Sequence, residues 1–175
     1  MKILFYHCEY VNFLDLKQSN RPLGIINDPP GPTQTSSSNC LLAFICVEKW
    51  DNENISDECT SIIIDHLKMI NKKNLIIVPF AHLSHFLADS GKAISILNLV
   101  NEKLENLHIN VERSSFGYHK SLECILSDFT IYGHRGSVAY RQIPNNVEKE
   151  FVNLVEELGL GAAEDIIKKL KRNND

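Results

Sequence analysis

The chain has 175 residues, of which 43% are apolar and 23% are charged, and its formal net charge is −4. This length suits one domain with its own hydrophobic core and is too short for two domains of ordinary size. The charge leaves no overall basic surface, which counts against a non-specific nucleic-acid binder. Any nucleic-acid partner must therefore be held by a local patch or by few phosphate contacts.

The cysteines and the first residues bear on the compartment. The chain has five cysteines without C-x-x-C spacing, namely Cys8, Cys40, Cys46, Cys59 and Cys124. This pattern indicates a reducing setting and predicts neither a disulfide framework nor a zinc site. The apolar run that opens the chain soon meets Glu9, so it is too short for a signal peptide or a membrane span. We therefore expect a cytoplasmic protein that does not contact a membrane.

The first 40 residues predict one strand and a long connection. Residues 2–7 form a short apolar run that is typical of a strand. Residues 14–40 contain four prolines, three consecutive serines and several asparagines. Such a composition predicts an irregular segment with room for an edge hairpin. Two roles stay open for this segment, a plain surface loop or a lid that contacts a partner.

Two apolar strands flank a helix in the next part of the chain. Residues 41–47 and 74–79 are continuous apolar runs, as found in strands that are covered on both faces. Between them, Ser56 is a candidate N-cap, and apolar residues from Cys59 to Ile70 recur at helical spacing. A strand, a helix and a strand of these lengths form a βαβ unit, so the two strands should be parallel.

A second crossover and several further strands complete the predicted sheet. Segment 82–88 is a candidate short helix, and a longer amphipathic pattern from Ala93 to Leu107 leads to a short strand at 108–111. Strand-like segments with short connections follow at 118–126, 129–132 and 137–143. Short connections indicate antiparallel pairing. The predicted fold class is therefore α/β, with a mixed sheet in which two βαβ crossovers precede an antiparallel meander.

The end of the chain has a different pattern. Two amphipathic segments, 147–158 and 163–170, follow Pro144 and predict a C-terminal helical pair. We therefore divide the chain into a domain of residues 1–144 and a helical extension or linker of residues 145–175.

Polar side chains follow two of the predicted parallel strands. His82 and His85 come after strand 74–79, and Glu48 and Lys49 come after strand 41–47. Ligands of open α/β sheets bind beyond the carboxyl ends of parallel strands. His7 would join this edge if the first strand runs in the same direction. His82 is therefore either a pocket residue or a hydrogen-bonded structural histidine.

The segment Phe116-Gly117-Tyr118-His119-Lys120 is the second candidate for a site. It places an ammonium group at the head of an apolar strand, where a cation is either a structural accident or a substrate contact. We expect this segment to face the segment around His82 across one pocket. The sequence has no phosphate-binding glycine loop and no G-x-S-x-G motif. His82 and His85 lack an evident third ligand for a metal ion.

At these residues the sequence resembles the N-terminal editing domain of archaeal threonyl-tRNA synthetase, whose fold is similar to that of D-aminoacyl-tRNA deacylases. The resemblance runs from Met1 to about Pro144. It rests on blocks in the same order along the chain: His7 with Tyr10, Ala43–Lys49, Pro79–Ser84, Phe116–Lys120 and Gly133-His134.

The resemblance implies hydrolytic removal of L-serine from seryl-tRNA(Thr). A synthetic site that accepts threonine rejects serine weakly, because one missing methyl group is worth only ~1–3 kcal/mol. By resemblance, Lys120 would anchor the seryl group and position water, and His82 would contact the terminal adenosine. The residues expected to line the pocket are Val47, Pro79, Ala81, Phe116, Gly117 and Tyr118. The implied partners are the 3′-terminal aminoacyl-adenosine of tRNA, a second copy in a homodimer, and a threonyl-tRNA synthetase catalytic subunit; no metal or organic cofactor is implied.

Two positions depart from the family pattern. The tyrosine that usually precedes the lysine is His119 here, and Val138 aligns with a glutamate of the last strand. Loss of that carboxylate would remove one partner of Lys120, and we expect His119, as a catalytic residue, to substitute as a polar contact. Two alternatives stay open: a broader D-aminoacyl-tRNA deacylase, and a degenerate domain that binds tRNA or a synthetase without catalysis.

Overall fold

A mixed β-sheet forms the centre of the structure, a computed structural model that describes residues 1–20, 24–29, 31–127 and 138–140. The strand order is β4-β3-β2-β1-β5, and β6 also pairs with β1. The strands are β1 (Lys2–Gln18), β2 (Gln34–Cys46), β3 (Asn74–Pro79), β4 (Asn110–Arg113), β5 (Tyr118–Leu126) and β6 (Val138–Tyr140). The helical elements are α1 (Ile55–Met69), the 3₁₀ turn η1 (Ala81–Leu83) and α2 (Ser90–Asn106).

The two predicted crossovers are present. β2 pairs in parallel with β3, and β3 pairs in parallel with β4, with α1 and α2 as the connecting helices. The expected N-cap was wrong, because α1 begins after Asn54 and Ser56 lies within its first turn. The Ser56 hydroxyl instead donates a hydrogen bond to the carbonyl oxygen of Glu53 at 2.6 Å.

The first two strands are much longer than the sequence indicated. β1 and β2 form an antiparallel ladder that extends from Lys2 opposite Cys46 to Leu14 opposite Gln34. Both ends of the connection expected at 14–40 are therefore strand, and the part between Gln18 and Gln34 connects the two. The serines of β2 conceal the strand in the sequence, because backbone hydrogen bonds hold them there while several of their side chains are exposed.

The antiparallel direction of β1 settles the position of His7, which was expected at the ligand edge only if the first strand ran parallel to β2. Because β1 runs against β2, His7 does not lie at the carboxyl edge of the parallel strands. Its ring instead approaches α1, where Nε2 of His7 lies 3.0 Å from Nε2 of His66.

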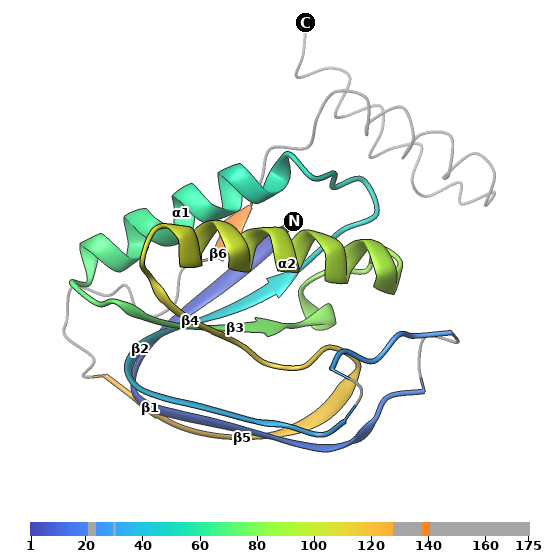
Figure 1. Ribbon diagram of the computed structural model, residues 1–175, viewed down its shortest axis with the longest axis horizontal. Coiled ribbons are helices and arrows are strands. Elements are labelled where there is room, and N and C mark those ends of the chain that lie inside the picture. The colour runs from blue at the N-terminus through green and yellow to red at the C-terminus, as the bar shows by residue number, and fades with distance from the viewer. Residues whose placement is uncertain (21–23, 30, 128–137, 141–175) are drawn as a thin grey trace, which may run out of the picture. The chain divides into compact units, whose positions relative to one another are not determined.

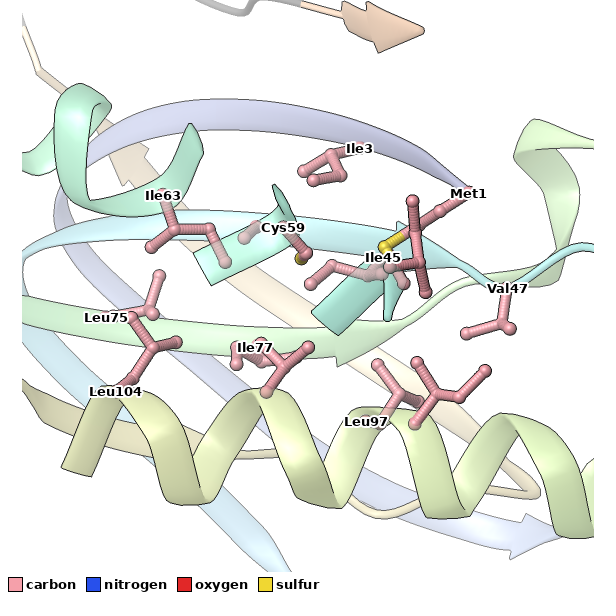
Figure 2. Close-up of a cluster of buried hydrophobic side chains, with 14 of the residues drawn as sticks. Met1, Ile3, Ile45, Val47, Cys59, Ile63, Leu75, Ile77, Leu97 and Leu104 are labelled. Carbon is pink, nitrogen blue, oxygen red and sulfur yellow. The ribbon is translucent and has the colours of Figure 1, made fainter. Parts of the chain in front are cut away.

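Each face of the sheet has its own hydrophobic core. α1 and α2 cover one face, and Ile63 of α1 and Leu104 of α2 lie near Leu75 of β3 in the cluster that Figure 2 shows. On the other face, Phe13 packs against Phe44 at a ring distance of 6.2 Å.

The contact between Phe13 and Phe44 shows that the β1–β2 hairpin folds back on the sheet. In the ladder, Phe13 pairs with Thr35, whereas Phe44 pairs with Leu4. The hairpin must therefore bend for the two rings to meet, and Figure 1 shows β1, β2 and β5 curving beneath β3. Asn39, with a φ of 49°, marks the bend in β2, since asparagine tolerates the left-handed region better than most residues.

The last strands pair as expected in direction. β5 has the predicted bounds and is antiparallel to β1, and β6 is antiparallel to the start of β1. The strand expected at 129–132 and the helical pair of 147–175 lie outside the described residues. In the part of the chain that the structure describes, no helix has the length and apolar character needed to cross a membrane.

Candidate functional site

An ion pair between β1 and β5 is the centre of the candidate site. Asp15 and Lys120 lie directly opposite each other in the ladder, with Oδ1 of Asp15 3.5 Å from Nζ of Lys120. Their side chains are 2% and 11% exposed, respectively. A buried ammonium is costly unless it is paired and hydrogen-bonded, so this lysine is held at that position by specific contacts.

The Asp15 carboxylate receives three further hydrogen bonds. Its Oδ2 accepts from the backbone N–H of Thr33 at 2.8 Å, from the Thr33 hydroxyl at 3.1 Å and from the Ser115 hydroxyl. Burial is the largest single influence and raises the pKa of Asp15. The hydrogen bonds from Ser115 and Thr33, together with the charge of Lys120, outweigh it and hold the pKa below its ordinary value. Asp15 is therefore an anion at neutral pH.

The Lys120 ammonium also has backbone partners. Nζ donates to the carbonyl oxygen of Ser115 at 2.6 Å and to that of Tyr118 at 3.4 Å, and it lies 5.9 Å from the centre of the Tyr118 ring. Burial lowers the pKa of Lys120, Asp15 opposes that effect, and Arg113 adds to it. Its contacts at 3.4 and 3.5 Å are long, so a substrate oxygen could share or replace them.

The segment before Lys120 is fixed by residues 26–29. Phe116 and Asp28 exchange two backbone hydrogen bonds, and the Arg113 guanidinium forms an ion pair with the Asp28 carboxylate. Gly117 has a φ of 82°, and a Cβ there would lie 2.4 Å from Oδ1 of Asn27. Only glycine fits that position without a shift of the neighbouring chain. The connection between β1 and β2 therefore packs against the 116–117 turn.

A short segment connects this ion pair to the carboxyl end of β3. The N–H of Ser114 donates to the carbonyl oxygen of Ile77 at 2.9 Å, and the next residue, Ser115, contacts both members of the pair. β3 ends two residues beyond Ile77, at Pro79. The Lys120 site and the end of β3 are thus joined through residues 114–115.

His82 lies in the 3₁₀ turn that follows β3. Its ring is exposed and meets the Phe80 ring edge to face at 5.1 Å, while Phe80 packs on Phe44 at 4.8 Å. Among the residues that the structure describes, no hydrogen bond or ring contact joins His82 to Lys120. A pocket shared by these two residues stays a prediction.

Three of the expected lining residues lie at the ends of β2 and β3. The N–H of Phe80, the residue after Pro79, donates to Ile45, and the carbonyl oxygen of Ala81 accepts a weak bond from the Cys46 thiol at 3.8 Å. Val47 is buried, and its carbonyl oxygen accepts from Ala88 at 3.1 Å. Phe116, Gly117 and Tyr118 surround the other end of the site, next to Lys120.

His119 points away from the ammonium. It is exposed and pairs with Lys17, and alternate residues of a strand face opposite sides. In the described structure the carboxylate that contacts Lys120 comes from Asp15. Val138 lies elsewhere in the ladder, in register with Leu4 near the start of β1.

A second buried polar cluster holds the segment that follows β2. The Met1 ammonium donates to Oε2 of Glu48 at 3.0 Å and to Oδ1 of Asp51 at 2.6 Å. The other Glu48 oxygen accepts from the Ser84 hydroxyl at 2.6 Å. This carboxylate therefore fixes Ser84, two residues after His82. Within the described residues, no group of three or more potential ligands is arranged to hold a metal ion.

Sequence reasoning missed Asp15, Thr33 and Ser115. One signal was present for Asp15, which continues the alternation of Val11 and Phe13 on the buried face of β1. A carboxylate among buried apolar residues of a strand needs a cation or hydrogen-bond donors beside it. Buried carboxylates with such partners are candidates for functional sites.

Comparisons with known proteins agree with this fold. A family model described as the archaea-specific editing domain of threonyl-tRNA synthetase matches residues 1–143. The threonine–tRNA ligase editing subunit of Saccharolobus solfataricus is 36% identical over 115 residues, which cover 64% of this chain and 28% of that protein. The threonine–tRNA ligase of Pyrococcus furiosus is 32% identical over 127 residues, which cover 69% of this chain and 20% of that protein. The chain therefore spans less than a third of the length of these relatives.

Similar folds occur among solved structures. The c-Myc DNA unwinding element binding protein matches with a TM-score of 0.61 and 10% identity, over 82% of this chain and 100% of that chain. At this identity the likeness shows the fold alone. It confirms the predicted α/β fold of the D-aminoacyl-tRNA deacylase type.

Proposed function

Because this chain belongs to the archaea-specific editing domain family of threonyl-tRNA synthetase, we propose that it removes L-serine from mischarged seryl-tRNA(Thr) by ester hydrolysis. The family that the sequence resembled is thus confirmed, and it is a proofreading family. The substrate, the reaction and the roles of single residues are our proposal.

The observation that carries the proposal is the Lys120 ammonium. It is nearly buried and joined through residues 114–115 to the end of β3, at the edge where ligands of such sheets bind. A cation there donates hydrogen bonds to the serine hydroxyl and to the attacking water. Its longer contacts, to the Tyr118 carbonyl and to Asp15, are the ones that the substrate would share.

The reaction needs a water molecule and an activated ester. Water adds to the ester carbonyl carbon, the bond between that carbon and the ribose oxygen breaks, and a proton of the water passes to that oxygen, which leaves free serine and the ribose hydroxyl. Preorganised donors stabilise the charge that develops on the carbonyl oxygen. Lys120 positions the seryl group and the water, and His82, on the exposed turn after β3, contacts the terminal adenosine. Val47, Pro79, Ala81 and Phe116 to Tyr118 line the pocket.

The partners follow from the same proposal. The domain acts on the aminoacyl-adenosine at the 3′ end of tRNA, as a homodimer, together with a threonyl-tRNA synthetase catalytic subunit. The matched relatives support this association, because they include full-length ligases and a separate editing subunit.

Deacylation assays test the proposal. The protein is incubated with seryl-, threonyl- and D-aminoacyl-tRNA, and the loss of each ester is followed. We expect selective loss of serine, and we expect Lys120→Met to lower kcat about 100-fold or more, the usual effect of removing a preorganised donor. Lys17→Met is the matched control, because Lys17 is an exposed cation on β1 and should not matter.

The other outcomes are distinct. Loss of D-amino acids alone would assign the protein to the D-aminoacyl-tRNA deacylases. Retained tRNA binding without any turnover would identify a binding domain that has lost catalysis. Equal effects of Lys120→Met and Lys17→Met on kcat would show that Lys120 has no specific role in the reaction.

A further inference from the structure

We infer that Asp15 is the positioning carboxylate of Lys120 in this chain. The inference rests on the proposed function, since it assigns a role within the same site. It replaces the expectation that His119 compensates for the missing glutamate.

Asp15 and Lys120 are in direct contact. Asp15 lies opposite Lys120 in the β1–β5 ladder, and their charged atoms are 3.5 Å apart with both side chains nearly buried. Opposed residues of an antiparallel pair project to the same face of the sheet. The register therefore keeps the carboxylate and the ammonium together.

Asp15 is itself held in place by hydrogen bonds. Thr33 and Ser115 donate three hydrogen bonds to the Oδ2 atom, and Oδ1 faces the lysine. A carboxylate with this many donors has one orientation. Ser115 contacts both partners, since its hydroxyl donates to Asp15 and its carbonyl oxygen accepts from Lys120.

His119, the other polar residue considered for this role, does not contact the ammonium. His119 faces away from Lys120 on the exposed side of β5. Among the described residues, the other charged and titratable groups near the ammonium are Arg113, whose guanidinium is paired with Asp28, and Tyr118, whose hydroxyl donates to the Pro29 carbonyl at 3.2 Å. Neither supplies a negative charge.

The role that follows has two parts. Asp15 favours the charged form of Lys120, because it opposes the lowering of the Lys120 pKa by burial and by Arg113. It also fixes the direction of Nζ, so that the donors of the ammonium meet the seryl group in one geometry. A displacement of about 1 Å in such a group can lower a rate about 100-fold.

The test compares Asp15→Asn with Glu123→Gln. Glu123 is an exposed carboxylate on β5 that faces Asn12 in the ladder, so its variant removes the same charge without touching Lys120. Two quantities are measured for each variant: kcat and KM for seryl-tRNA(Thr) across pH, and the titration of Lys120 by NMR after reductive ¹³C-methylation. The Lys120→Met spectrum assigns the signal.

We expect Asp15→Asn to lower kcat about 100-fold with little change in KM. Its Lys120 resonance should titrate at lower pH, and the alkaline limb of the rate profile should move the same way. Glu123→Gln should match the wild type in both measurements. Asp15→Glu, which retains the charge, should restore the Lys120 titration and part of the rate.

Other results separate the inference from the proposed function. An active wild type with unchanged kcat in Asp15→Asn would overturn the inference and leave the proposed function intact. An unchanged Lys120 titration would overturn it as well. A wild type inactive on seryl-tRNA(Thr) would refute the proposed function and, with it, the role of Asp15. If Asp15→Asn does not fold, Ser115→Ala replaces it as the test variant, because it removes the hydrogen bond to Asp15 and keeps the charges of Asp15 and Lys120. Ser115→Ala should lower kcat, and an unchanged kcat would overturn the inference.

Discussion

Removing the Asp15 carboxylate should destabilise the fold strongly. At 3.5 Å and an effective dielectric constant of about 20, the attraction between Asp15 and Lys120 is about 5 kcal/mol before desolvation is subtracted. Loss of one partner leaves the other charge buried and costs about 3–5 kcal/mol. Typical domains have about 5–15 kcal/mol of stability in total. Asp15→Asn should therefore lose a large share of the unfolding free energy, even though asparagine has nearly the same shape.

A double-mutant cycle measures the coupling directly. Urea unfolding at pH 7 is compared for the wild type, Asp15→Asn, Lys120→Met and the double variant. We expect the double variant to be more stable than the sum of the single effects predicts, by about 1–3 kcal/mol. The control cycle uses Asp57 and Lys103, an exposed pair with side chains 74% and 34% accessible, which should couple by about 0–1 kcal/mol.

The coupling should depend on pH with a defined sign. Because the pKa of Asp15 is lower in the folded state than in the unfolded state, the unfolded chain binds more protons as the solution is acidified. The contribution of Asp15 is therefore complete above its ordinary pKa and is lost as the pH falls through its folded-state pKa. A coupling no larger than that of the exposed control pair, or one that persists in acid, would refute the electrostatic reasoning.

Two further predictions concern the turn before Lys120 and the cysteines. Gly117→Ala should lower the unfolding free energy by about 1–3 kcal/mol, because alanine disfavours a φ of 82° and its Cβ would meet Asn27. The control is Gly31→Ala, which has open space around it and should change the unfolding free energy by less than about 0.5 kcal/mol in the same urea titration. Equal effects of the two substitutions would contradict this reasoning. Burial raises the pKa of Cys59 to about 12 and that of Cys46 to about 11, whereas Cys124 is exposed. A disulfide reagent at pH 8 should therefore label Cys124 rapidly and the buried thiols only on unfolding, and a fast reaction that survives Cys124→Ser would disprove this.

The parallel part of the sheet could be predicted because its signal is local. β2 and β3 carry uninterrupted apolar runs, and the helices between strands have clear helical periodicity. Each of these patterns is visible within one segment, because the residues that face the core recur at the period of that segment's own secondary structure. The direction of β1 was not predictable in this way, because a single short apolar run does not say whether its neighbour lies parallel or antiparallel.

The pairing of Asp15 with Lys120 depended on features that a sequence pattern does not contain. Up to Cys8, the even-numbered residues of β1 face the second core, but after the bend near Glu9 and Asn39 the odd-numbered Val11 and Phe13 face it. The β1–β5 register also shifts on both sides of the segment that carries Asp15. A shift of one residue exchanges the two faces of a strand, so small irregularities decided which residue met the lysine.

The same bend and register shifts determine which face of β1 carries Asp15. In a regular hairpin, an aspartate at position 15 would lie on a face set by the start of β1. The bend reverses that face and brings Asp15 beneath the sheet, where Lys120, Thr33 and Ser115 enclose it. A charge is tolerated there only because all of its partners arrive together. It follows that a change in the bend at Asn39, far from the ammonium in sequence, should disturb Lys120 as surely as a change at Asp15.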